Sequence, residues 1–137
     1  RFTEIIQHWQ EFFAKGRRLT VADMKFLPIE KENIPYRFSV RIQGETFEFE
    51  VHYNAEYDFF TVDLYRDGEA LAYGEKVIYG KALFSSYAKE GYPKVALIPF
   101  DLAENETRVS YDNLMETVFI YMFEREDFDD AELDETS

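Results

Sequence analysis

The stretch YRFSVRIQGETFEFEVHYN, residues 36–54, decides the fold class of this chain. Apolar and polar side chains alternate along both halves of the stretch, and a Gly-Glu pair separates the halves. Such alternation predicts two β-strands that are each buried on one face, and a Gly-X pair suits a two-residue type II′ turn. We therefore predict a β-hairpin whose turn is formed by Gly44 and Glu45.

That turn would fix the register of the hairpin on both of its faces, because turn type and loop length decide which residues pair. Apolar side chains then meet across the strands, and an Arg-Glu pair forms on the polar side, where opposite charges attract. The expected partners are Phe38 with Val51, Val40 with Phe49, Ile42 with Phe47, and Arg41 with Glu48.

A second hairpin is expected from residue 59 onward. Alternation there leads into Asp67 and Gly68, and an Asp-Gly pair is a strong signal for a type I′ turn. The expected partners are Arg66 with Glu69, Leu64 with Leu71, and Val62 with Tyr73.

Further extended segments complete the predicted fold. They are expected at residues 77–79, 82–84, 95–100 and 117–123. About seven short strands with no helical pattern between them predict a mainly β fold, either an antiparallel sandwich or a small barrel. The length of 137 residues suits a single domain.

The N-terminal segment has a helical period instead. Its apolar residues fall on one stripe, and Gly16 is a natural helix stop, so an amphipathic helix is expected over about residues 2–15. The stripe is our candidate interface: Phe2, Ile5, Ile6, Trp9 and Phe13. The residues alone favour packing of the stripe on its own domain over docking on a partner, since monomers rarely leave such a patch open.

Three segments are therefore expected along the chain. Residues 1–23 form the helix, as an extension that ends before Met24, residues 24–123 form the β domain, and residues 124–137 form an acidic tail. The tail has one basic and eight acidic residues, and like charges at this density resist compaction. It has no glycine for the sharp turn of a calcium loop, so a solvated tail is favoured over a metal site.

The composition excludes several classes of function. The formal net charge of −13 argues against broad contact with nucleic-acid backbones and with anionic membranes. No apolar run approaches the roughly 20 residues that a membrane-spanning helix needs. The chain has no cysteine, which excludes disulfides, a thiol nucleophile and cysteine-ligated metal.

The sequence contains none of the common catalytic or metal-binding motifs considered next. His8 and His52 have no second histidine nearby to form a metal pair. Neither Ser85 nor the serine after it stands in the glycine-flanked elbow of a hydrolase. Glu48 and Glu50 share a strand face, which we interpret as a solvent-exposed outer face. The sequence therefore predicts a protein that is not an enzyme and that has no metal or cofactor.

Several stretches are informative when they are taken together. They are MKFLPI at 24–29, the first hairpin with its lead-in at 34–54, FFTVDLYRDG at 59–68, Gly74, GKALF at 80–84, and two extended pieces at 96–99 and 118–121. These stretches resemble a known family, the cyanophage-type baseplate plug proteins of contractile-tailed phages. The resemblance covers roughly residues 24–123 and leaves out the N-terminal stripe and the acidic tail.

The resemblance implies a structural, non-enzymatic component of the tail baseplate of a phage or a phage-tail-like bacteriocin. Its partners would be the hub, the spike and neighbouring subunits, with several copies in the assembly and synthesis in the bacterial cytoplasm. A competing hypothesis is a small acidic inhibitor, such as an immunity protein, an antitoxin or a nucleic-acid-mimicking anti-defence protein. A small ligand-binding barrel is a third, and it would need an internal pocket.

Overall fold

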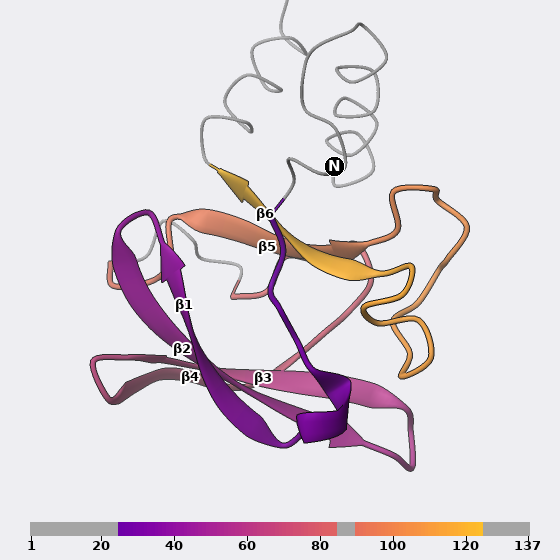
Figure 1. Ribbon diagram of the computed structural model, residues 1–137, viewed down its shortest axis with the longest axis horizontal. Coiled ribbons are helices and arrows are strands. Elements are labelled where there is room, and N and C mark those ends of the chain that lie inside the picture. The colour runs from indigo at the N-terminus through magenta and orange to yellow at the C-terminus, as the bar shows by residue number, and fades with distance from the viewer. Residues whose placement is uncertain (1–24, 85–89, 125–137) are drawn as a thin grey trace, which may run out of the picture.

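The computed structural model describes residues 25–84 and 90–124, which form two antiparallel β-sheets (Figure 1). After a short 3₁₀ turn, η2 (Lys31–Asn33), the strands are β1 (Tyr36–Ile42), β2 (Glu45–Asn54), β3 (Phe59–Arg66), β4 (Glu69–Lys76), β5 (Val95–Phe100) and β6 (Phe119–Glu124). One sheet has the order β1-β2-β3-β4, and the other pairs β5 with β6. The prediction of a mainly β, antiparallel fold is confirmed.

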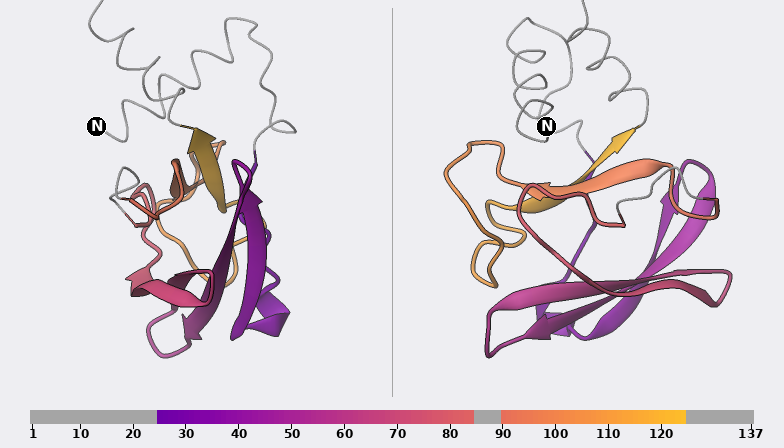
Figure 2. Two further views of the ribbon diagram at one scale, coloured as in Figure 1. Left: turned by 90° about the vertical axis from the view of Figure 1, so that its left-hand side faces the viewer. Right: turned by 180° about the vertical axis from the view of Figure 1, so that it is seen from behind.

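The small sheet lies over one side of the four-stranded sheet (Figures 1 and 2). The core between them includes Phe49 of β2, Phe60 of β3 and Ile120 of β6, and all three are fully buried. Burying one such side chain contributes about 1.5–3 kcal/mol. Among the described residues the two sheets remain separate, so the sandwich was the correct alternative and no closed barrel forms.

Both edges of the small sheet are covered by chain segments that are not strands. On the β6 side, the N–H of Leu27 donates to the carbonyl of Ile120 at 3.0 Å. On the β5 side, the N–H of Leu83 donates to the carbonyl of Leu97 at 2.7 Å. The extended pieces predicted between β4 and β5 form only this bridge and single hydrogen bonds, so the described residues contain six strands and not seven.

The first hairpin forms, but its predicted turn was wrong. The turn residues are Gln43 and Gly44, with φ values of 50° and 81°, which is the two-residue positive-φ pattern of a type I′ turn. Glu45 consequently belongs to β2 and pairs with the guanidinium of Arg66. The type I′ turn also matches the right-handed twist of the strands that it joins.

Moving the turn by one residue moves every cross-strand partner by two. Val40 therefore faces Phe47, and the predicted pairing of Arg41 with Glu48 is wrong, because Arg41 faces Thr46. The faces themselves were predicted correctly, since a shift of two residues keeps each side chain on its own side of the sheet.

The second hairpin begins in the predicted register and then leaves it. Arg66 faces Glu69 across the Asp67-Gly68 turn as expected, but Leu64 faces Ala72 and Val62 faces Glu75. The cause is a pair of irregularities in the ladder, near which Gly74 has a φ of 65° and donates its N–H to the carboxylate of Asp63 at 2.7 Å. As a result Tyr73 is 72% exposed instead of facing Val62.

The predicted N-terminal helix over residues 2–15 and the acidic tail after Glu124 lie outside the described residues. Within residues 25–84 and 90–124, no helix has both the length and the apolar character that crossing a membrane requires.

Candidate functional surface

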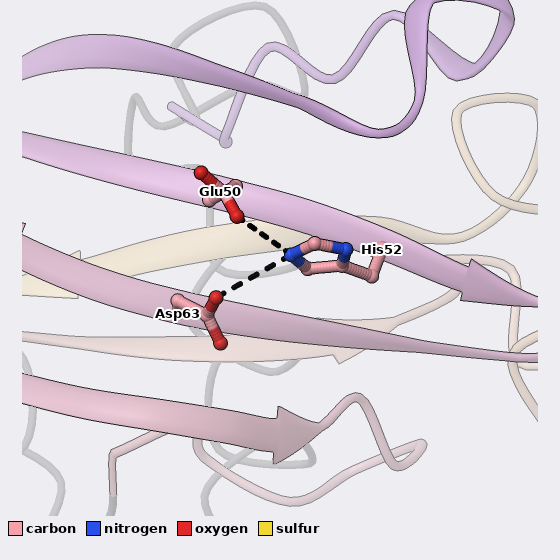
Figure 3. Close-up of side chains that lie close together, drawn as sticks. All are labelled: Glu50, His52 and Asp63. Atoms are coloured by element: carbon pink, nitrogen blue, oxygen red, sulfur yellow. Dashed lines mark hydrogen bonds and ion pairs between the residues drawn. The ribbon is translucent and has the colours of Figure 1, made fainter.

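The outer face of the four-stranded sheet carries a compact group of charged side chains (Figure 3). Glu50 and His52 stand two residues apart on β2, and Asp63 on β3 is the cross-strand neighbour of Glu50. The Nε2 atom of His52 lies 2.8 Å from Oε2 of Glu50 and 3.4 Å from Oδ2 of Asp63. Three titratable groups from two strands thus converge on one point of this face.

The guanidinium of Arg37 holds the carboxylate of Glu50 in place. The guanidinium of Arg37 donates to Oε1 of Glu50 from Nε at 3.2 Å and from Nη2 at 3.1 Å. Hydrogen bonding to His52, followed by the contact with Arg37, lowers the pKa of Glu50 below its ordinary value. Arg37 also lies 3.7 Å from the ring centroid of Tyr65, a cation–π contact that orients the guanidinium.

Within the described residues, one group of side chains could hold a metal ion: Glu50, His52 and Asp63. Each offers one ligand atom, and these atoms all lie within 4.8 Å of one another. The sequence placed Glu50 and His52 on the polar face, which is correct. It did not bring in Asp63, because that requires the register between β2 and β3. The loop at 54–58 that sets this register has no strong turn signal.

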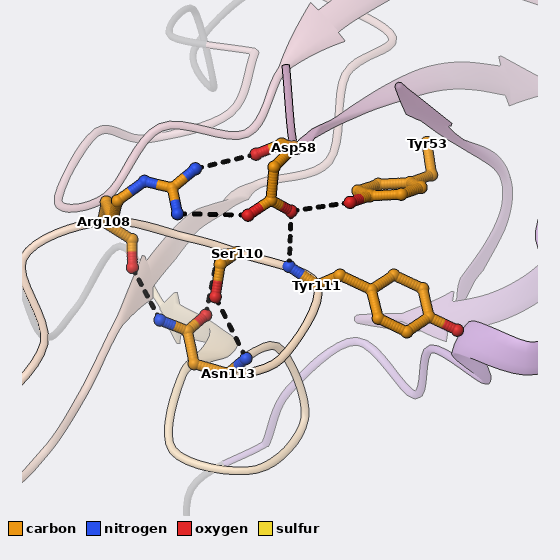
Figure 4. Close-up of polar contacts among 6 residues, drawn as sticks. All are labelled: Tyr53, Asp58, Arg108, Ser110, Tyr111 and Asn113. Carbon is orange, nitrogen blue, oxygen red and sulfur yellow. Dashed lines mark hydrogen bonds and ion pairs between the residues drawn. The ribbon is translucent and has the colours of Figure 1, made fainter. Parts of the chain in front are cut away.

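A second polar group joins the β2–β3 turn to the long loop before β6 (Figure 4). Asp58 accepts hydrogen bonds from the Tyr53 hydroxyl at 2.7 Å and the Tyr111 N–H at 2.9 Å. Arg108 donates to the Asp58 carboxylate at 3.2 Å. These contacts, the Tyr111 N–H first, lower the pKa of Asp58. Asn113 accepts from the Ser110 N–H at 2.8 Å and so closes the loop on itself.

These contacts describe a structural junction. Every oxygen of the Asp58 carboxylate is used to hold two distant parts of the chain together, and the same contact with Asp58 raises the pKa of Tyr53. No pattern in the sequence indicates this junction, since residues 58 and 108 are brought together only by the fold.

Large apolar side chains are exposed at several places on the described surface: Phe26, Tyr57, Tyr73, Ile78 and Tyr111. Tyr57 stands on the β2–β3 turn and Tyr73 on the edge strand β4, where they are 69% and 72% exposed. Exposed tyrosines on turns and sheet edges are suited to contact with another protein.

Comparison with known families places the chain in a family. The family model described as cyanophage baseplate Pam3 plug gp18 matches residues 24–126. The chain belongs to this baseplate plug family. No curated protein matches the chain.

Membership of the plug family assigns a structural role in the phage tail baseplate and implies contact with other baseplate or tail proteins. The match spans all six described strands. It begins after the segment that carries the predicted interface stripe. That stripe, together with His8 and Ser85, lies outside the described residues.

Proposed function

We propose that this plug-family chain is a non-enzymatic subunit that docks near the hub and spike of a contractile tail, in a phage or a phage-tail-like bacteriocin. The observation that carries the proposal is the family match over residues 24–126. The protein would be made in the bacterial cytoplasm and built into the baseplate in several copies.

The sandwich suits the role of a rigid insert. Its core is packed with side chains from both sheets, and Asp58 connects the long loop before β6 to the β2–β3 turn through hydrogen bonds. A domain held in this way can present its edges and loops to neighbouring subunits without folding on contact, which lowers the entropic cost of docking.

The surface that we propose for docking has two parts. The first is the exposed tyrosines on the described domain, Tyr57 and Tyr73. The second is the N-terminal stripe of Phe2, Ile5, Ile6, Trp9 and Phe13, which supplies apolar anchors of the kind that dominate interface energetics.

The stripe is tested by incorporation into tails. The double variant Ile5→Asp and Trp9→Asp should be lost from purified particles while its β domain stays folded, because two apolar anchors become charged. The matched control is Gln7→Asp with Gln10→Asp, which adds the same charge to polar positions of the same segment. Normal incorporation of the first variant would exclude the stripe as a docking element.

A further inference from the structure

In the carboxylates of Glu50 and Asp63, one oxygen accepts hydrogen bonds from neighbouring groups and the other oxygen points toward His52. Oε1 of Glu50 takes both donors of Arg37, and Oδ1 of Asp63 takes the Gly74 N–H at 2.7 Å. The remaining oxygens, Oε2 and Oδ2, both point to the same ring nitrogen of His52 (Figure 3). This is the arrangement of metal sites, in which outer hydrogen bonds orient the ligating atoms.

A proton on His52 does not satisfy both oxygens. Nε2 carries at most one hydrogen, in either protonation state of the ring, and that hydrogen donates well to one acceptor. The 2.8 Å contact with Glu50 uses it, which leaves Oδ2 of Asp63 at 3.4 Å. Asp63 is only 8% exposed, so water compensates its second oxygen poorly.

A metal ion in place of that proton would bond to all three atoms. Zinc binds imidazole nitrogen and carboxylate oxygen at about 2.0–2.2 Å, so the ligand atoms of a tetrahedral site stand about 3.4 Å apart. The separation of 3.4 Å between His52 and Asp63 already meets this requirement, and that between His52 and Glu50 has to widen from 2.8 Å. The third pair of ligand atoms, on Glu50 and Asp63, lies within 4.8 Å. His52 has a side chain that is 43% exposed, so it can make this adjustment and a water molecule can reach the fourth position.

We propose that Glu50, His52 and Asp63 bind one zinc ion on the outer face of the four-stranded sheet, with water as the fourth ligand. The imidazole selects a transition metal over magnesium, which prefers six oxygen ligands. The bound ion clips β2 to β3 on the face opposite the core. The inference does not depend on docking in a baseplate, and the isolated full-length chain can test it.

The experiment is isothermal titration of tag-free protein with zinc chloride at neutral pH, together with the His52→Gln and Glu50→Gln variants. Wild-type protein should bind one zinc per chain, and His52→Gln should weaken the affinity at least about tenfold, because the nitrogen ligand is lost. Glu50→Gln should weaken it as well. Magnesium chloride should give no saturable binding.

The matched control is His8→Gln, which removes the other histidine of the chain. It should leave the zinc affinity unchanged. Circular dichroism of each apo variant checks that loss of binding is not loss of fold. Zinc binding that survives His52→Gln, or that disappears in His8→Gln, would overturn the assignment, and so would the lack of saturable binding by the wild-type chain at millimolar zinc.

Discussion

Replacing Phe49 with alanine probes the sandwich core at its centre. Phe49 lies in the middle of β2 with no exposed surface, and its ring centroid is 6.5 Å from that of Phe84, on the segment leading toward β5. The substitution removes the buried ring and leaves a cavity, which costs about 3–5 kcal/mol at such a site. Phe38 faces Phe49 across the strands and is only partly buried, so Phe38→Ala should cost clearly less.

Urea unfolding followed by circular dichroism, which reports the loss of the two β-sheets, measures both variants. The free energy of unfolding of Phe49→Ala should fall by about 3–5 kcal/mol with an unchanged slope in urea, since the slope reports the surface exposed on unfolding. Phe49→Leu serves if the alanine variant does not fold, and its loss should be smaller. Equal losses for Phe49→Ala and Phe38→Ala would refute the placement of the core between the two sheets.

Three further predictions concern acid, alkali and the tail. The native contacts lower the pKa of Asp58, so the stability that its carboxylate contributes is present above the ordinary pKa of 3.8 and is lost as the pH falls toward the lower native pKa. Asp58→Asn should therefore make the free energy of unfolding less dependent on pH in this acidic range. Burial raises the pKa of Tyr121 from 10.0 to about 12. The stability that its neutral hydroxyl contributes to the folded protein is therefore full below pH 10 and is lost as the pH rises to about 12. After discounting for solvent screening this amounts to about 1–2 kcal/mol, and Tyr121→Phe should remove that loss when thermal unfolding is compared at pH 9 and 11.5. Deleting residues 125–137 should leave incorporation into tail particles unchanged, whereas a nucleic-acid mimic would lose salt-sensitive binding to its target.

The faces of the strands were predictable from the sequence, and their registers were only partly so. Alternation of period two depends on each strand alone, and it gave the buried side of β2 correctly. The register depends on the conformation of the turn, and the glycine at position 44 is compatible with a type I′ turn over 43–44 and a type II′ turn over 44–45. Both turns leave the same residues buried, so the pattern could not choose between them.

The polar sites were out of reach of the sequence for a different reason. Asp63 stands in a strand whose neighbours are apolar, and nothing in the sequence shows that Gly74 bends β4 so that its N–H reaches that carboxylate. Likewise, Asp58 and Arg108 are 50 residues apart and meet only because two loops fold together. Such contacts arise from tertiary packing and leave no local periodicity.

The resemblance to the plug family, and the structural role that it implies, rested on short stretches of sequence that alternation in β-strands and turns would also produce. The family match confirms the resemblance and extends it to residue 126. The competing acidic-inhibitor hypothesis rested on net charge, and much of that charge lies after the last strand, in a segment that the match barely enters.

Quantitative mass spectrometry of purified tail particles tests the central claim most directly. A structural plug should be found in the particles at a fixed ratio to the other baseplate proteins, and it should stay there through a high-salt wash. Absence of the protein from intact, functional tails, with all of it free in the lysate, would contradict the account.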